Sequence, residues 1–243
     1  MKGLVWFRND IRMDDNPSLR RAFEECDSVI CFYIWSAEQL KRHNESNVKQ
    51  DFLIQNLKSL AANLNTVNVP LLVIESKNFN AVKDDIGDLI QEHLINKIYW
   101  NKEFAFDEIT RDKDVYDALQ AKEVDIEISN DQIVYEPGFL RTGQDNPFSV
   151  FTPFKRRWIE NFDMKFLDID FNYPIKEKLN FDSNIEKFNF GFTSSHGVDM
   201  QLWPIGEKSA IDRVNDFLDN RAVDYSKNRN DPILDGTSRI SPY

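Results

Sequence analysis

The sequence predicts an α/β protein built around a doubly wound, five-stranded parallel sheet of the Rossmann-like kind. Short apolar runs, each long enough for one strand, alternate with longer stretches whose apolar residues recur at helical spacing. The runs are continuously hydrophobic, which is typical of strands buried on both faces. In such a sheet, ligands bind at the carboxyl ends of the strands where the strand order reverses. The expected strands are residues 4–7, 29–35, 71–74, 98–100 and 124–128.

The segments between these strands carry helix signals. A first helix is expected at about residues 17–25, because Asn16 is a suitable N-cap and a proline follows at the first helical position. Residues 47–64 have a clear helical period, made by Phe52, Leu53, Leu57, Leu60, Ala61 and Leu64. Further helices are expected near residues 79–93 and 107–122.

The regular alternation ends after about residue 133, so residues 1–133 are expected to form one α/β domain. Residues 134–204 contain turn sequences, one short amphipathic helix near 150–158 and a polar, aperiodic stretch, all typical of an interdomain linker. Residues 205–243 begin a second unit with a helix at 207–220. Its apolar stripe requires a partner, and self-association is one way to bury it. The stripe comprises Ala210, Ile211, Val214, Phe217 and Leu218.

Composition excludes several classes of protein. With 243 residues and 41% apolar residues the chain can bury a core, but its net charge of −11 makes it a poor nucleic-acid binder as a whole. The eight glycines lack the spacing of a dinucleotide fingerprint or a P-loop, which argues against a dehydrogenase or an ATPase. The three histidines are scattered, so no metal signature is present.

Cysteine usage and hydropathy indicate the compartment. The longest apolar run, residues 29–35, is too short to span a bilayer, and no signal peptide is recognisable. Cys26 and Cys31 are the only cysteines, so a disulfide framework is not expected. We therefore expect a reduced, cytoplasmic protein without a membrane partner.

Two segments suggest ligand binding. Residues 236–241 (GTSRIS) combine hydroxyls with one arginine, a set that suits a phosphate but also forms ordinary turns. Asp107 and Glu108 follow the fourth strand. They have two interpretations: Asp107 caps a helix while Glu108 favours its dipole, or the pair accepts hydrogen bonds from a ligand.

Four segments resemble the DNA photolyase/cryptochrome family, in the family's order and with suitable spacing. They are WFRNDIR (6–12), VFTPFKRRW (150–158), WPIGE (203–207) and GTSRISPY (236–243). The chain is most similar to the N-terminal part of bacterial-type, folate-antenna (class I) photolyases. The resemblance implies that the sheet binds a light-harvesting antenna chromophore and that residues 205–243 begin a helical FAD-binding domain, most of which would lie beyond Tyr243.

The resemblance also implies site residues. For the antenna these are Asp107 and Glu108, with 5,10-methenyltetrahydrofolate favoured over a deazaflavin or FMN; Glu108 would accept from the pterin edge. Asp107 stands where the family has an asparagine. Arg229 would contact damaged DNA. The implied FAD contacts are Tyr225, Thr237, Ser238, Arg239, Ile240 and Ser241.

The implied activity is that of a deoxyribodipyrimidine photo-lyase, a carbon–carbon lyase. Antenna energy passes to reduced FAD, which donates an electron to a cyclobutane pyrimidine dimer flipped out of the duplex. The resemblance places no catalytic residue in this chain and most of the helical FAD domain beyond it, so we expect the chain to bind FAD poorly and to be inactive alone. Two alternatives stay open: a cryptochrome-like blue-light photoreceptor, and a stand-alone antenna- or nucleotide-binding α/β module.

Overall fold

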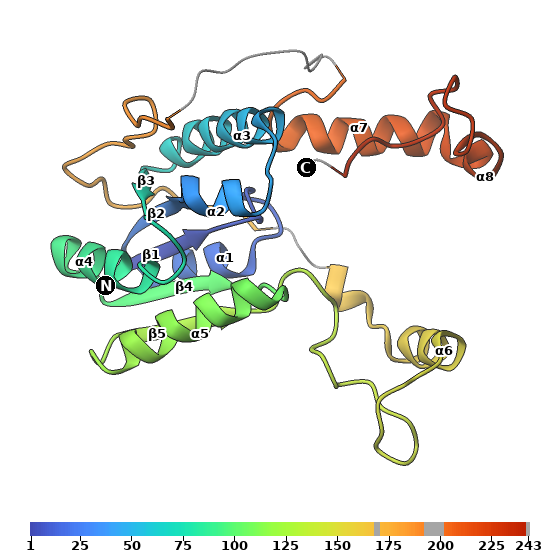
Figure 1. Ribbon diagram of the computed structural model, residues 1–243, viewed down its shortest axis with the longest axis horizontal. Helices are drawn as coiled ribbons and strands as arrows, with labels where there is room; N and C mark the ends of the chain where they lie inside the picture. Colours follow the sequence, from blue (N-terminus) through green and yellow to red (C-terminus); the bar gives the residue numbers. More distant parts are fainter. Residues whose placement is uncertain (168–170, 192–201, 242–243) are drawn as a thin grey trace.

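A five-stranded parallel sheet in the order β3-β2-β1-β4-β5 forms the centre of the molecule (Figure 1), which confirms the predicted fold class. The computed structural model describes residues 1–167, 171–191 and 202–241. Successive connections run outward from β1 through β2 to β3 on one side, and through β4 to β5 on the other. The strand order therefore reverses between β1 and β4. The strands are β1 (Lys2–Phe7), β2 (Ser28–Trp35), β3 (Leu71–Glu75), β4 (Lys97–Asn101) and β5 (Asp125–Ser129).

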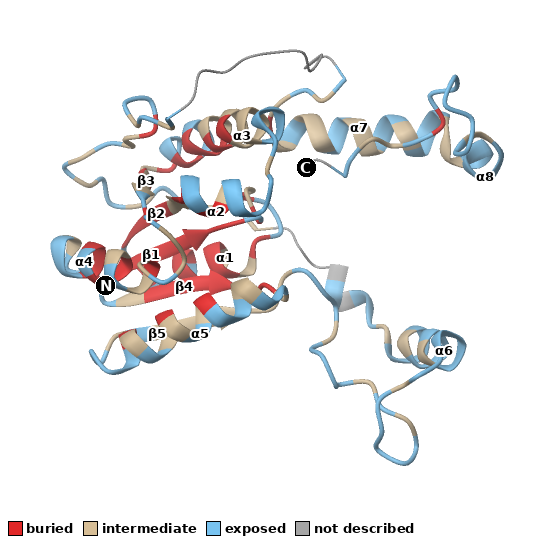
Figure 2. Ribbon diagram, in the orientation of Figure 1, coloured by how far each residue is buried: buried red, intermediate tan, exposed pale blue. Residues whose placement is uncertain are grey.

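Helices cover both faces of the sheet because alternate residues of each strand point to opposite faces. On one face, Val5 packs in a cluster with α1 and α3; on the other, Leu4 packs in a cluster with α4 and α5. Figure 2 shows the buried residues concentrated in the strands and on the inner sides of these helices. The helices of this part are α1 (Pro17–Glu25), α2 (Ala37–Arg42), α3 (Asn47–Asn65), α4 (Val82–His93) and α5 (Phe106–Gln120).

The structure differs from the sequence-based expectation at two helix starts. Helix α2 was not expected, since its six residues are too few to show a period; Ser36 caps it. Helix α5 begins after Ala105, whose side chain makes no capping hydrogen bond, so the expected cap at Asp107 is wrong. Asp107 and Glu108 lie in the first turn instead, where their charges favour the positive end of the helix dipole.

Residues 171–191 run along the outside of the α/β part. Lys176 Nζ donates to the carbonyls of Phe23 and Cys26, at the carboxyl end of α1. At the free edge of β3, Asn184 Oδ1 accepts from Val73 N at 2.7 Å, and Asn184 Nδ2 donates to Val73 O at 2.9 Å. Side chains of this segment therefore satisfy backbone groups that an edge strand would otherwise leave unpaired.

The last part of the chain meets the α/β part at one junction. Gly206 has φ of +96°, and a Cβ there would lie 2.7 Å from Ser59 Oγ, so only glycine fits. The Glu207 carboxylate accepts from two consecutive amides, Met13 N at 3.0 Å and Asp14 N at 2.8 Å. Burial raises the pKa of Glu207, while these two amides act in the opposite direction.

The helices outside the α/β part are exposed. Figure 2 shows α6 and α7 projecting from the buried centre, and neither contains a buried residue. Among the residues that the structure describes, no helix combines the length and apolarity needed to cross a membrane. The elements are α6 (Phe151–Asn161), the 3₁₀ helix η1 (Met164–Leu167), α7 (Glu207–Asn220), the 3₁₀ helix η2 (Ala222–Asp224) and α8 (Tyr225–Asn228).

Candidate functional site

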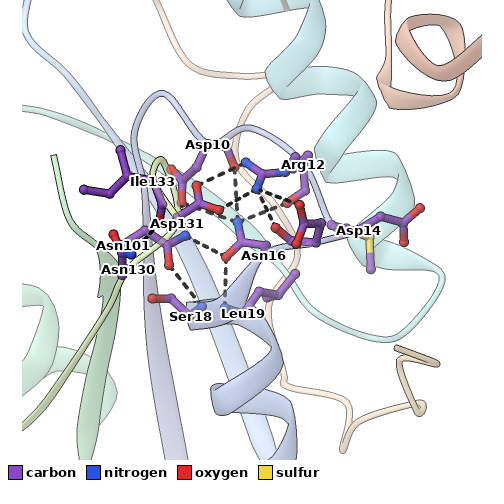
Figure 3. A network of polar contacts seen from close by, with 12 residues as sticks. Asp10, Arg12, Asp14, Asn16, Ser18, Leu19, Asn101, Asn130, Asp131 and Ile133 are labelled. Atoms are coloured by element: carbon purple, nitrogen blue, oxygen red, sulfur yellow. Dashed lines mark hydrogen bonds and ion pairs between the residues drawn. The ribbon is translucent and has the colours of Figure 1, made fainter. Parts of the chain in front are cut away.

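A buried polar network holds the loop after β1 (Figure 3). Asp10 Oδ1 accepts from Arg8 N at 2.8 Å, and Asp10 Oδ2 accepts from Asn101 Nδ2 at 2.6 Å. Asn16 caps α1 through Leu19 N and also accepts from Asn101 Nδ2 at 2.9 Å. These contacts join β1, α1 and β4 at the point where the strand order reverses, so the loop has a fixed position beside the carboxyl ends of the strands.

A second contact fastens the same loop to the end of β5. Arg12 Nη2 lies 2.5 Å from Asp131 Oδ1, and Arg12 Nη1 lies 3.2 Å from Asp131 Oδ2. This is the two-point geometry in which arginine binds a carboxylate most strongly. The loop after β1 is therefore held by contacts with α1 and β4 and by the contact with Asp131 after β5.

A cavity of about 210 Å³ opens beside this loop, at the carboxyl ends of β1 and β2. Residues from α2, the start of α3, the start of α4 and the first turns of α5 complete its wall. The wall includes the aromatic rings of Trp6, Tyr33 and Phe79. Burial raises the pKa of Tyr33 well above its ordinary value, so its hydroxyl keeps its proton.

Two buried arginines pack on one of these rings. The guanidinium carbons of Arg8 and Arg111 lie 4.6 and 4.7 Å from the centre of the Trp6 ring, and both residues are 6% exposed. Arg111 Nη2 donates to Glu103 Oε2 at 2.7 Å, and Arg8 Nη1 lies 3.2 Å from Asp112 Oδ2. The charges are therefore paired, as buried charges must be.

Buried nitrogens in this wall lack a hydrogen-bond partner among the residues described, including Trp6 Nε1 and the Nε and Nη2 atoms of Arg8. Arg8 Nη2 makes no hydrogen bond to any of the residues described. Buried polar atoms without a partner are rare in folded proteins and often mark a place where a ligand or ion completes the network. The position of Arg8 in the wall fits a ligand that brings a hydrogen-bond acceptor.

The predicted antenna pair separates into two environments. Glu108 lines the cavity. Asp107 Oδ2 lies 3.4 Å from His43 Nε2 and 3.7 Å from Arg42 Nη2, at the end of α2. The structure therefore brings Glu108, and not Asp107, to the cavity wall, where an acceptor could meet a ligand.

The predicted FAD contacts lie on the C-terminal segment, away from this wall. The Tyr225 ring packs edge-on against Phe217 at 5.7 Å, and the Arg229 guanidinium lies 5.7 Å from the centre of the Tyr225 ring. Gly236 packs tightly against the backbone of Asn228, where a Cβ would lie 2.7 Å from the carbonyl. The segment is thus folded back toward α7 and α8.

Residues after Gly236 present polar groups on that fold. Thr237 and Ser241 are exposed, while Ser238 and Arg239 are half-buried and Ile240 is 38% exposed. The Ser238 carbonyl accepts from Arg213 Nε at 2.9 Å, and Arg239 pairs with Asp235 at 3.0 Å. The exposed hydroxyls suit phosphate oxygens, but Arg239 would have to exchange its carboxylate partner to join them.

Several wall residues were not predicted from the sequence. Arg8, within the WFRNDIR segment, was not predicted as a site residue; it pairs with Asp112 and also lines the cavity. Tyr33, Phe79 and Arg111 were missed because they lie in different parts of the chain, in β2, before α4 and in α5, and only the fold brings them together. A charged residue directly after a buried strand, as at Arg8, is the one local signal that could have been used. In the part of the chain that is described, no group of three or more His, Cys, Asp or Glu side chains could hold a metal ion.

Comparison with known proteins gives consistent matches. The family model for DNA photolyase matches residues 3–174. A deoxyribodipyrimidine photo-lyase of Buchnera aphidicola is 30% identical over 100% of this chain and 50% of its own length. Cryptochrome-2 of Arabidopsis thaliana is 25% identical over 100% of this chain and 40% of its own. The chain thus spans about half the length of the curated photo-lyases that it matches.

Solved structures share the fold. A bacterial class III photolyase from Agrobacterium tumefaciens has a TM-score of 0.80 at 24% identity, covering 99% of this chain and 49% of that one. An archaeal photolyase from Sulfolobus tokodaii, described with two FAD molecules and a novel light-harvesting cofactor, has a TM-score of 0.69 at 20% identity, covering 100% and 51%.

Proposed function

The chain belongs to the DNA photolyase family, and we propose that it provides the antenna-binding part of an enzyme that repairs cyclobutane pyrimidine dimers with light. The photo-lyase relatives support this activity for the whole protein. The substrate of the whole enzyme would be damaged DNA, and the enzyme would act in the cytoplasm. The net charge of −11 means that the DNA-binding surface has to be local, and Arg229 is our candidate residue for it.

The balance of charge in the cavity carries the antenna proposal. Three cationic side chains line it, Arg8, Lys49 and Arg111, and so do three carboxylates, Glu45, Glu103 and Glu108. A wall with equal charges and several aromatic rings does not select a phosphate. It suits a planar heteroaromatic group that carries both hydrogen-bond donors and acceptors, as an antenna chromophore does.

Each end of such a group has a proposed partner. Glu108 would accept from ring N–H and amino groups, and the unpaired Arg8 Nη2 would donate to a ring carbonyl. The Tyr33 hydroxyl, which remains protonated, is a further donor in the wall. When bound, the chromophore would absorb near-ultraviolet or blue light. The residues of this chain would orient it and keep water from its rings.

The volume of the cavity favours a pterin. At about 210 Å³ it is smaller than the roughly 300 Å³ at the lower end of common ligand pockets. It would therefore hold a two-ring system with the rest of the molecule outside. We propose 5,10-methenyltetrahydrofolate as the antenna, with a deazaflavin or FMN as the less favoured choice.

The C-terminal segment is the proposed FAD-binding part. Thr237, Ser238 and Ser241 would bind the diphosphate with Arg239, and Tyr225 and Ile240 would contact the rest of the cofactor. The exposed hydroxyls of Thr237 and Ser241 support this placement. FAD, when bound, would supply the electron that splits the dimer. Because this segment offers few buried contacts, we expect it to bind FAD weakly by itself.

An absorption titration tests the antenna proposal. Purified chain is titrated separately with methenyltetrahydrofolate and with FAD. We expect a red-shifted folate band, lost in Glu108→Ala because that change removes the acceptor, and little bound FAD. Glu123→Ala, on the turn that follows α5, is the control and should leave the band in place.

Two outcomes would contradict the proposal. Folate binding that is equal in Glu108→Ala and wild type would remove Glu108 from the site. A chain that binds no planar chromophore at all would leave the cavity without this function.

A cryptochrome-like photoreceptor is the second candidate, because curated relatives include cryptochromes. We favour repair because the photo-lyase relatives are the more similar ones. A stand-alone binding module is the third candidate. Dimer splitting by the full-length protein under blue light, measured on an oligonucleotide with one dimer, separates repair from the other two.

A further inference from the structure

One loop lies between the cavity and the start of α7. Arg8 and Asn9, at the beginning of this loop, line the cavity. Its middle is fixed by the buried hydrogen bonds of Asp10 and by the contact of Arg12 with Asp131. A group that is bound to this loop is therefore held in a fixed position relative to the cavity.

The Glu207 carboxylate is bound to this loop at two points. Its Oε2 accepts from Met13 N at 3.0 Å, and its Oε1 accepts from Asp14 N at 2.8 Å. Successive backbone amides of this kind form a site for an anion, and here the anion belongs to the chain itself. Met13 is buried, and its carbonyl accepts from the Tyr173 hydroxyl. Because each carboxylate oxygen has its own donor, the two bonds fix the direction of the side chain as well as its position.

These two bonds fix α7 because Glu207 is its first residue. Helix α7 itself contains no buried residue, so packing does little to set its direction. A further contact at its start comes from α3, where Asn56 Oδ1 accepts from Gly206 N at 3.0 Å. Further along α7, Arg213 Nε donates to the Ser238 carbonyl at 2.9 Å, which joins the proposed FAD-binding segment to the helix. The position of that segment therefore depends on the start of α7.

We propose that Glu207 is a positioning residue for light harvesting, an inference that rests on the proposed function. Its carboxylate fixes α7, and with it the proposed FAD-binding segment, against the loop that lines the antenna cavity. Transfer of excitation energy depends on the distance between two chromophores and on their relative orientation. Glu207 acts through the polypeptide by keeping the two binding sites in one arrangement. It is not a contact of either chromophore.

The distance between two spin labels tests this role in the whole chain. The labels are attached to Ala62→Cys on α3 and Asn215→Cys on α7, two exposed positions, while both native cysteines are buried. Pulsed electron paramagnetic resonance at low protein concentration, where pairs of chains do not contribute, should give one narrow distance distribution. In Glu207→Ala we expect this narrow distribution to be lost, because the amides of Met13 and Asp14 lose their acceptor. Glu207→Gln should retain part of it, because its side-chain oxygen can still accept from one amide.

Two controls accompany this measurement. Asp212→Ala removes an exposed carboxylate that pairs with Lys208 on the same helix, and its distance distribution should match that of wild type. The folate titration is repeated on Glu207→Ala, which should bind folate as wild type does because Glu207 does not line the cavity. Unchanged folate binding also shows that the α/β part of the variant is folded.

The outcomes separate the positioning role from the antenna function. A narrow distribution that persists in Glu207→Ala would overturn the positioning role and leave the antenna function in place. A distribution broadened equally by Asp212→Ala would overturn it too, by showing that any loss of charge on α7 releases the helix. Absence of folate binding in wild type would overturn the antenna function, and with it the role of the contact in light harvesting, whatever the distances are.

Discussion

Arg8 illustrates how one residue acquires two roles. It follows the buried residues Trp6 and Phe7, so its side chain leaves the strand at the carboxyl edge of the sheet. There it pairs with Asp112 and packs on Trp6, which stabilises its buried charge. Because its Nε and Nη2 atoms make no hydrogen bond to the residues described, the residue also has capacity for a ligand.

Glu25 gives a pH-dependent prediction at the residue scale. Hydrogen bonds from Lys97 at 2.8 Å and Tyr99 at 2.9 Å lower the pKa of its carboxyl. A carboxyl whose pKa is lowered in the folded state stabilises the fold at pH values above the ordinary pKa of the group. This stabilisation is lost as the pH falls through the lowered pKa of the folded state.

We therefore expect Glu25→Gln to lower the free energy of unfolding by less than about 1 kcal/mol at pH 6, because the carboxyl is partly exposed. Near pH 3 the decrease should be smaller still. Urea unfolding at both pH values measures the difference. Gln120→Ala removes no titratable group and should have the same effect at each pH. A cost for Glu25→Gln that does not change with pH would show that the Lys97 contact is absent in solution.

At the scale of elements, residues 171–191 cover the free edge of β3, where a sixth strand could otherwise pair. Its side chains, not its backbone, pair with β3, so the sheet is closed at that edge without being extended. Asn184 makes two of these bonds, to both polar groups of Val73. An aperiodic stretch of sequence thus protects an edge that could pair with another chain.

Removing the Asn184 side chain should expose that edge. Asn184→Ala leaves the Val73 amide and carbonyl without these partners, so we expect a loss of roughly 1–2 kcal/mol in unfolding free energy. Hydrogen exchange at the Val73 amide should become faster. Asn189→Ala, which removes an acceptor for the nearby Gly191 amide, is the control. Unchanged exchange at Val73 would mean that the edge is protected in another way.

At the scale of the whole molecule, the buried centre and the exposed helices differ in kind. The α/β part has two apolar clusters, one on each face of the sheet. Residues 134–167 contain a small aromatic cluster of their own, in which Tyr135 contacts Phe139, Trp158 and Phe166. Helix α7 exposes Ile211 and Leu218 at 46% and 58%, so its apolar stripe is partly uncovered in the single chain.

An uncovered stripe predicts self-association of this chain. We expect sedimentation velocity to show a mean mass that rises with protein concentration, because pairing buries apolar surface at about 25 cal/mol per Å². Leu218→Asp should hold the chain monomeric, whereas Lys208→Ala, on an exposed position of the same helix, should not. A wild-type chain that stays monomeric at every concentration would contradict the prediction.

The sequence by itself determined the sheet, its strands and most of its helices, because buried parallel strands are short continuous apolar runs and amphipathic helices have a helical period, and both can be recognised locally. The family resemblance of the sequence singled out Glu108, whose role toward a chromophore stays a prediction. The sequence did not predict α2, which has too few residues to show a helical period. It also did not predict the start of α5, because Ala105 has no capping side chain.

Only the tertiary structure decided how the cavity is built. Arg8, Tyr33, Phe79 and Arg111 come from different parts of the chain, and their spacing in the sequence gives no sign that they meet. The fold also separated Asp107 from Glu108, two neighbours that the sequence treated as a pair. Consecutive residues in a helical turn point about 100° apart, so one faced the cavity wall while the other met α2.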